Sequence, residues 1–183
     1  MSVEQTIDVG SEFGLDVHVL SPASAYTHEV RTVFSRYPAA VGALCASVDG
    51  EPVGLVATSL AVGISYDPPM VTFSVRRQST TWPTLRSAPR IGVSVLGRGQ
   101  KDLVRQLAGP AAGRFADCAT HETPQGALFL MGAMSWFDCK IAGEVEVGDH
   151  LMVILELVEI GHDHRTAPLV YHDRKFHVLT EHP

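Results

Sequence analysis

Short apolar runs separated by turn residues are the feature that most constrains the fold of this chain. Val53, Leu55 and Ala57 alternate with other residues in a period of two, which predicts a strand. The range 70–75 (MVTFSV) predicts a second strand by its apolar and β-branched residues. Between the two, the range 66–69 (YDPP) ends regular structure, because proline fixes φ and lacks an N–H group. The segment is therefore predicted to form a strand, a polar bend and a strand.

A hydroxyl-rich turn, Gln78-Ser79-Thr80-Thr81, follows the second predicted strand. Serine and threonine favour the N-termini of helices, where free N–H groups can also bind an anion. We therefore predict a short helix from Thr81 through Leu85, with Pro83 tolerated in its first turn. The turn is a candidate phosphate seat, and ordinary helix capping is the alternative interpretation.

The same patterns predict the rest of the chain. Strands are predicted over 41–48, from Pro52 onward, and over 90–96, 134–145, 151–160, 169–172 and 175–179. Helices are predicted over 26–37 and 100–108, residues 109–126 and 162–167 as loops, and residues 1–24 as a loosely organised N-terminal lead-in. Many short strands with few helices favour a closed antiparallel barrel, and a length of 183 residues fits a single domain, 1–183.

Composition excludes several classes of function. A formal net charge of −6 argues against a protein that binds nucleic acid through clustered Lys and Arg. No apolar run approaches the roughly 20 residues that a membrane-spanning helix needs. The N-terminus shows no basic region followed by an apolar core, so no secretory signal is predicted and we expect a cytoplasmic protein.

Three cysteines agree with a reducing compartment, because they form no CxxC motif and cannot all pair. Cys45 and Cys139 lie in strand-like runs and are predicted to be buried apolar residues. Cys118 lies in the predicted loop. None of the three has the positively charged neighbourhood that activates a thiol.

The order of the polar motifs resembles the flavin reductase-like family, the split-barrel flavoproteins that serve two-component monooxygenases. The matching motifs are Thr58-Ser59, Ser65-Tyr66-Asp67-Pro68-Pro69, Ser79-Thr80-Thr81, Arg114-Phe115, Gly148-Asp149-His150 and Pro168-Leu169-Val170-Tyr171. The resemblance extends from about Val30 to Leu179. It implies a mostly β fold, a split β-barrel of Greek-key type with a few short helices.

The resemblance also implies a function and a site. The expected activity is NAD(P)H:flavin oxidoreduction, in which a hydride passes from the nicotinamide to FMN or FAD and reduced flavin reaches a partner monooxygenase. His150 would be the catalytic residue, near the flavin and the nicotinamide. The residues expected to bind the cofactor are Ala57, Thr58, Ser59, Leu60, Ser74, Ser79, Thr80 and Thr81. A homodimer with the flavin between subunits is expected.

Two departures from the family pattern leave other functions open. Pro38-Ala39-Ala40 and the range 61–64 (AVGI) lack residues that relatives usually carry. One alternative is an oxidase or dedicated metabolic enzyme that retains its flavin, and another is a non-enzymatic flavin- or haem-binding module on the same barrel. No motif separates FMN from FAD or NADH from NADPH.

Charged residues near the motifs have two interpretations each. Arg76 or Arg77 could reach a flavin phosphate, since guanidinium matches phosphate oxygens, or both could simply be exposed at a strand end. His162-Asp163-His164 could suggest a metal, but the sequence offers no ligands to complete a site, so we interpret it as a solvated loop and expect no metal. Trp82 and Trp136 are predicted in the core or at a dimer interface.

Overall fold

The structure, a computed structural model, describes residues 27–179. The described residues divide into two units, one that ends at Tyr37 and one that begins at Pro38. In the first unit the structure describes helix α2 (Thr27–Ser35), close to the predicted range 26–37. Val33 and Phe34 on this helix are exposed. The predicted lead-in, residues 1–24, lies outside the described residues.

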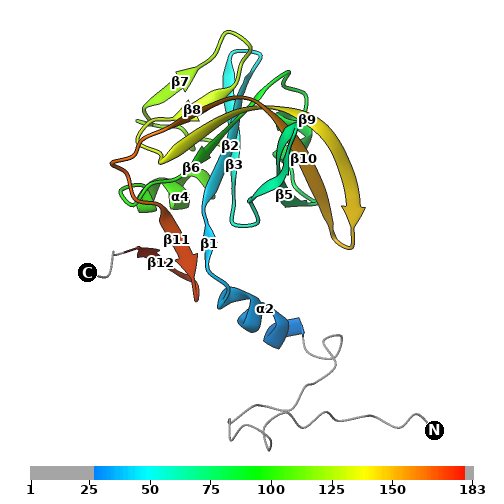
Figure 1. Cartoon of the computed structure of the whole chain (residues 1–183), viewed down its shortest axis with the longest axis vertical. Coiled ribbons are helices and arrows are strands. Elements are labelled where there is room, and N and C mark those ends of the chain that lie inside the picture. Colours follow the sequence, from blue (N-terminus) through cyan, green and yellow to red (C-terminus); the bar gives the residue numbers. More distant parts are fainter. Residues whose placement is uncertain (1–26, 180–183) are drawn as a thin grey trace, which may run out of the picture. The chain divides into compact units, whose positions relative to one another are not determined.

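The second unit is mostly β, as predicted (Figure 1). Its largest sheet has seven antiparallel strands in the order β3-β2-β6-β9-β10-β5-β4. They are β2 (Gly42–Val48), β3 (Glu51–Ala57), β4 (Ala61–Tyr66), β5 (Pro69–Arg76), β6 (Ile91–Val95), β9 (Ser135–Val147) and β10 (His150–His162). Smaller sheets join β1 (Ala39–Ala40), β11 (Leu169–His172) and β12 (Lys175–Val178), and β7 (Thr120–Glu122) with β8 (Leu128–Leu130). Over residues 38–179 the helices are α3 (Trp82–Leu85) and α4 (Lys101–Leu107).

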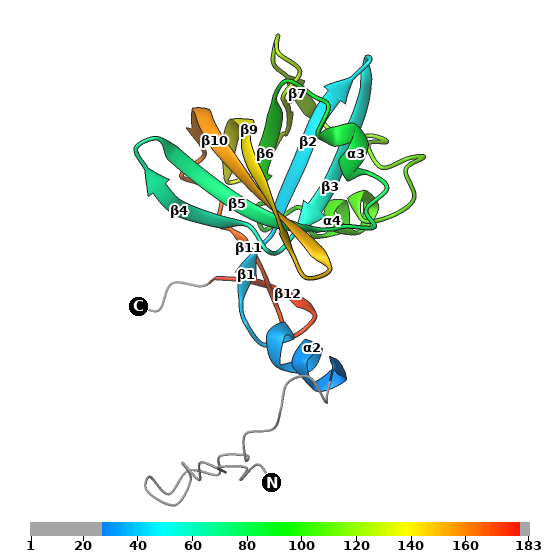
Figure 2. The same cartoon turned by 90° about the vertical axis from the view of Figure 1, so that its right-hand side faces the viewer.

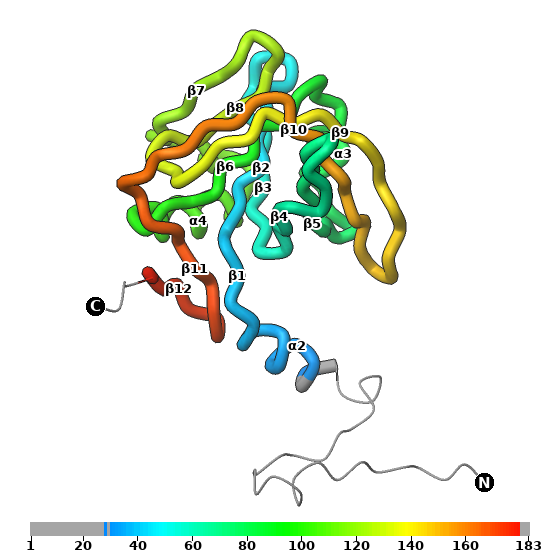
Figure 3. The backbone as a smooth tube through the Cα atoms, viewed as in Figure 1, coloured from blue at the N-terminus to red at the C-terminus, as the bar shows by residue number. Residues whose placement is uncertain are grey.

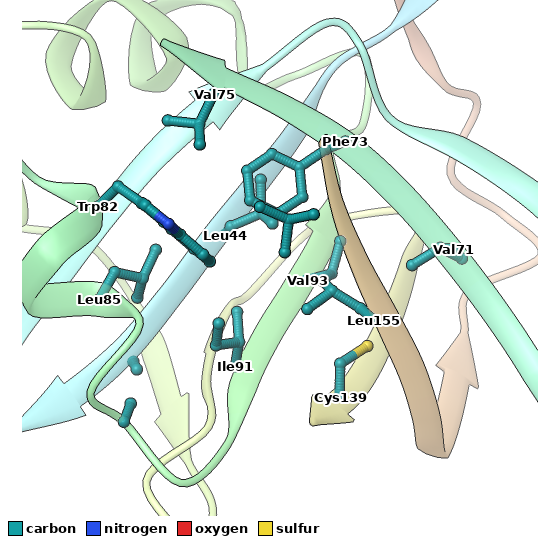
Figure 4. Packing of buried hydrophobic residues seen from close by; sticks show 13 residues of the cluster. Leu44, Val71, Phe73, Val75, Trp82, Leu85, Ile91, Val93, Cys139 and Leu155 are labelled. Atoms are coloured by element: carbon teal, nitrogen blue, oxygen red, sulfur yellow. The ribbon is translucent and has the colours of Figure 1, made fainter. Parts of the chain in front are cut away.

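The large sheet curls on itself (Figure 2), and an apolar core fills its concave side. Side chains from β2, β5, β6, β9 and β10 meet there, and α3 covers it with Trp82 and Leu85. Figure 4 shows Phe73 of β5 facing Trp82, with ring centroids 5.4 Å apart in an edge-to-face arrangement. Aromatic pairs of this geometry add stabilisation beyond their buried area. The curled sheet and its core make the split barrel expected from the sequence.

Strand β2 is buried on both faces, which explains its nearly continuous apolar sequence. Leu44 points into the barrel core, whereas Cys45 joins a second cluster formed with α4, β8 and β11. Cys45 and Cys139 are buried, as predicted, and Cys118 is partly exposed in its loop. β2 therefore connects the barrel to the layer that covers it.

The hairpin of β9 and β10 is the longest feature of the sheet, with 13 residues in each strand. Its ladder shifts register between Ile154 and Leu155 and again between Leu157 and Glu159. Such irregularities bend a strand pair and increase its twist. Figure 3 shows the resulting bent ribbon, which crosses the barrel.

The structure corrects two predictions in the irregular regions. An additional edge strand, β4, lies between the first predicted strand and the predicted bend, and within that bend only Asp67 and Pro68 turn between Tyr66 and Pro69. The predicted loop 109–126 contains β7, which pairs with β8. Both are exposed edge strands, and burial on one face is what produces the alternation used to recognise a strand. The other predicted elements occur within a few residues of their expected ends.

Among residues 27–179, no helix has the length and hydrophobicity to cross a membrane.

A glycine in β6 lets β8 pass directly over the sheet. A Cβ at Gly92 would lie 2.4 Å from the carbonyl oxygen of Leu128. We expect Gly92→Ala to lower the free energy of unfolding by about 1–3 kcal/mol, because backbone must move to admit the methyl group. Gly143→Ala in β9 is the matched control, since no atom lies within 4 Å of its Cβ position. Urea unfolding of both variants checks this, and equal stabilities would contradict it.

Candidate functional site

A polar groove lies where β3 and β5 end. Its volume is about 680 Å³. It is lined by Leu55, Val56, Ala57, Thr58, Ser59, Ser74, Val75, Arg76, Gln78, Ser79, Thr80, Thr81, Arg114 and His150. We call this the polar groove. It contains eight of the nine residues that the sequence nominated for catalysis or cofactor binding.

The pairing of β5 with β10 places His150 in this groove. His150 lies directly opposite Arg76 in the antiparallel ladder. Opposite residues project from the same face, so both side chains share the face that also carries Ser74. The alternate residues Phe73 and Val153 fill the core on the other face. One ladder thus builds both the core and one wall of the groove.

His150 is held by its neighbour. Its Nδ1 lies 2.7 Å from Oδ1 of Asp149, in the turn between β9 and β10. This contact lowers the pKa of the Asp149 carboxyl, chiefly through the hydrogen bond and the charge of the imidazole. Asp149 is therefore a carboxylate near neutral pH, and it fixes the orientation of the ring. With Nδ1 engaged, Nε2 is the ring atom available to a ligand.

The two arginines at the end of β5 differ in their surroundings. The guanidinium of Arg77 forms an ion pair with Glu146 of β9 at 3.6 Å. The backbone N–H of Arg77 donates to the carbonyl of Asp149. Arg76 lines the polar groove. Of the two residues considered from sequence, Arg76 is the one placed to meet a ligand there.

The hydroxyl-rich turn is organised by two contacts. Ser79 Oγ accepts a hydrogen bond from the backbone N–H of Trp82 at 3.2 Å, so Ser79 supplies the capping oxygen of α3. Thr81 makes no side-chain capping bond. Its hydroxyl accepts instead from Arg114 Nη1 at 2.9 Å. The turn thus combines two hydroxyl groups and a guanidinium at one end of the groove.

Arg114 joins three segments that are distant in sequence. Nε donates to the carbonyl of Gly109, and Nη1 donates to the carbonyl of Gly54 on β3 as well as to Thr81. Gln106 of α4 holds the same loop, with its Nε2 2.7 Å from the carbonyl of Ala116. In the sequence, Arg114 is indicated only as part of the Arg114-Phe115 motif. Its place in the groove depends on long-range contacts that no local pattern reports.

The hydroxyl of Ser59 is engaged within the protein. Its Oγ donates to the carbonyl of Ser74 at 3.1 Å and accepts from the N–H of Ser74 at 2.9 Å. The side chain therefore fastens the end of β3 to β5, across the groove wall. Leu60 does not line the groove. It packs against the barrel core, and its Cδ2 would lie 2.9 Å from a Cβ at Gly42.

Thiol and metal chemistry find no support among the described residues. Burial raises the pKa of the Cys45 thiol to about 12, and burial, helped by nearby Asp117, also raises the pKa of Cys118. Such thiols are protonated near neutral pH and are poor nucleophiles. His162 and His164 contact each other at 2.8 Å, but no group of three or more potential ligands occurs within 27–179.

Comparison with known proteins identifies relatives over most of the chain. The sequence profile of the flavin reductase like domain matches residues 34–180. An NADH:FMN oxidoreductase from Rhodococcus erythropolis is 31% identical over 156 residues, covering 81% of this chain and 80% of the relative. The reductase component of a 4-nitrophenol 4-monooxygenase/4-nitrocatechol 2-monooxygenase from Rhodococcus opacus is 30% identical over 131 residues, or 72% of this chain and 70% of the relative.

A further relative is considerably longer. The stachydrine N-demethylase reductase subunit of Rhizobium meliloti is 31% identical over 126 residues, which is 68% of this chain and about half, 54%, of that protein. Among solved structures, a nitrilotriacetate monooxygenase component B homologue from Mycobacterium thermoresistibile superposes with a TM-score of 0.81 at 20% identity, covering 87% of this chain and 89% of that one. This structural likeness establishes the fold.

The contacts of Arg114 predict a test of groove order. Arg114→Lys keeps the charge but removes the fork that joins Gly109, Gly54 and Thr81. We expect faster amide hydrogen exchange in residues 109–119 and a loss of about 1–3 kcal/mol in stability, because hydrogen bonds to a charged group are lost. Arg105→Lys is the control, since Arg105 contacts the exposed Asp102. Unchanged exchange in 109–119 would contradict the role assigned to Arg114.

Proposed function

The chain belongs to the flavin reductase-like family, and we propose that it uses the polar groove to transfer a hydride from NADH or NADPH to FMN or FAD. The observation that carries this proposal is the convergence of His150, the end of β3 and the hydroxyl-rich turn on one groove. The named activity of the Rhodococcus relative, NADH:FMN oxidoreduction, supports it. So does the profile match over residues 34–180, which supports one flavin reductase-like domain over that range.

The chemistry of the groove fits a flavin. Val56 and Ala57 offer an apolar surface to a flat ring, and backbone groups of Thr58 and Ser59 lie at the same strand end. Thr80 and Thr81 offer hydroxyls to the ribityl chain and phosphate, and the guanidinium of Arg114 offers positive charge beside them. The hydroxyl of Ser59 is engaged with Ser74, so we assign its contact to the backbone.

The bound flavin and nicotinamide supply the hydride chemistry, and the protein supplies orientation and a place for a proton. We assign the proton to His150 Nε2, because Nδ1 is engaged with Asp149. The carboxylate of Asp149 holds a proton on Nδ1, which leaves Nε2 as the ring atom that could hold and pass on the proton that reduction of the flavin takes up. Arg76, opposite His150, would attract the anionic co-substrate.

We propose that reduced flavin passes to a partner monooxygenase in the cytoplasm. The Rhodococcus opacus relative is named as the reductase component of such an enzyme. The three cysteines are free thiols, which supports a reducing compartment.

We also propose that the protein is a homodimer. Exposed apolar residues gather on β4, β9 and β10, including Val62, Tyr66 and Val145, which are 62%, 86% and 51% exposed. A second copy of the chain would remove this apolar surface from water.

Steady-state kinetics test the proposed reaction. We expect flavin-dependent oxidation of NADH or NADPH, saturable in flavin, and a decrease of roughly 10²-fold in kcat/KM for His150→Ala, the lower range for a positioned proton-transfer group. His162→Ala, at the other end of β10, is the matched control. Equal effects of the two substitutions would contradict a catalytic role for His150. Binding of flavin without nicotinamide oxidation would favour a protein that retains its flavin for another reaction.

Analytical ultracentrifugation tests the assembly. We expect a sedimentation mass twice that of the 19.7 kDa chain, and a shift toward monomer when Val62 and Tyr66 are replaced by aspartate. Asp substitution of Val33, an exposed residue of α2, is the control for added charge on an exposed apolar position. A monomer at micromolar concentration would contradict the dimer.

A further inference from the structure

A cavity lies at the far end of the β9–β10 hairpin and is not used by the reaction described above. Its volume is about 410 Å³, within the range of about 300–1,000 Å³ that small-molecule sites occupy. The last part of β10 and the β7–β8 ribbon contribute to its walls. His150 begins β10, whereas residues 159–161 near the end of that strand line the cavity. We call it the distal cavity.

Trp136 of β9 forms one wall of the distal cavity and is held in place. Its indole Nε1 donates to the carbonyl of Leu130 at 2.8 Å. Gly161 lies directly opposite Trp136 in the β9–β10 ladder, so that position places no side chain against the ring. A Cβ at Gly161 would lie 3.6 Å from Cε3 of Trp136, an ordinary contact, and a larger side chain would extend into the space beside the indole. The indole is therefore ordered and accessible from the cavity.

The other walls are mostly apolar. Phe129 lies opposite His121 in the β7–β8 ladder, and opposite residues project from the same face. Met131 and Ile160 also line the cavity and are 49% and 72% exposed. A bound ligand would remove their apolar surface from water. Aromatic rings and a thioether sulfur both pack well against a flat ring.

One carboxylate supplies the negative charge of the distal cavity. Glu159 is exposed, and the described residues that line the cavity include no lysine or arginine. Among residues 27–179 no basic side chain lies within 4.0 Å of the Glu159 carboxylate, since Arg90 pairs with Asp138 and Lys140 pairs with Glu156. A carboxylate without a cationic partner beside aromatic faces favours a ligand with a positive charge.

We propose that the distal cavity binds a small aromatic compound that carries a positive charge, such as an arylalkylammonium ion. The ring of the ligand would lie against Trp136, Phe129 and Met131, and its cationic group would meet Glu159. An indole face attracts cations as well as rings, and the carboxylate supplies the opposite charge. The inference is independent of hydride transfer, because no described residue lines both this cavity and the polar groove.

A heteronuclear NMR titration of the full-length protein with phenethylammonium tests the distal cavity without any turnover. We expect the indole N–H signal of Trp136 to shift, whereas that of Trp82, which is buried in the barrel core, stays in place. Phenethyl alcohol has nearly the same shape without the charge, and we expect it to bind about fivefold more weakly, because the ion pair and the cation–π contact are lost. Hydrocinnamate, the corresponding anion, should bind more weakly still.

Two substitutions separate charge from shape. Glu159→Gln should lower the affinity for phenethylammonium to about that for phenethyl alcohol, and Glu156→Gln is the matched control on the same strand, outside the cavity. Gly161→Val should weaken binding of all three probes, because its side chain would occupy the space beside Trp136. Gly143→Val is the control for this change, since no atom lies within 4 Å of its Cβ position. Gly161→Ala, which fits at ordinary contact, should weaken binding less than Gly161→Val.

Three results would overturn the inference: no shift of the Trp136 signal, equal affinity for phenethylammonium and hydrocinnamate, or unchanged affinity in Glu159→Gln. Shifts confined to the residues of the polar groove would also overturn it, because they would place the probe there. A protein that shows the expected shifts but oxidises no nicotinamide would refute only the proposed reaction. The two proposals therefore fail separately.

Discussion

The antiparallel pairing of β5 with β10 is the interaction on which the rest of the structure depends. Its register directs Phe73 and Val153 inward to the core and Ser74, Arg76 and His150 outward to the polar groove. A shift of one residue would exchange the two sets, since strand side chains alternate between faces. The burial of the core residues therefore fixes the position of the functional ones. Stability and site geometry share one physical cause here.

Local sequence patterns predicted the parts of the fold that bury one face or end in strong turn residues. Phe73 and Val75 alternate with Ser74 as in a strand, and Asp49-Gly50, a dipeptide typical of hairpin turns, lies between β2 and β3. The edge strand β4 escaped prediction because it buries almost nothing. β4 is held by its hydrogen-bonded pairing with β5. Such pairing leaves no periodic pattern in the sequence of β4 itself.

The polar groove shows a similar division between what local motifs indicate and what the fold adds. The order of motifs along the chain is enough to group Thr58, the 79–81 turn and His150, and all of them line the groove. Arg114 needed the fold, because its contacts with Gly54 and Thr81 span 60 and 33 residues of sequence. Leu60 lies beside the Thr58-Ser59 motif but packs against the core, which its position in the sequence does not reveal. The residues that local motifs identified differ from those that they missed in the sequence separation of their contacts more than in residue type.

Trp82 connects the core with the groove in a way that has an optical consequence. Its ring packs against Phe73, its backbone N–H is bonded to Ser79 of the groove, and its Nε1 donates to Glu144. The other tryptophan, Trp136, lines a separate apolar cavity with Phe129 and Ile160. We therefore expect the emission of Trp82 to respond to changes in the turn that a ligand would touch. The structure gives the protein an intrinsic fluorophore whose surroundings join the core to the groove.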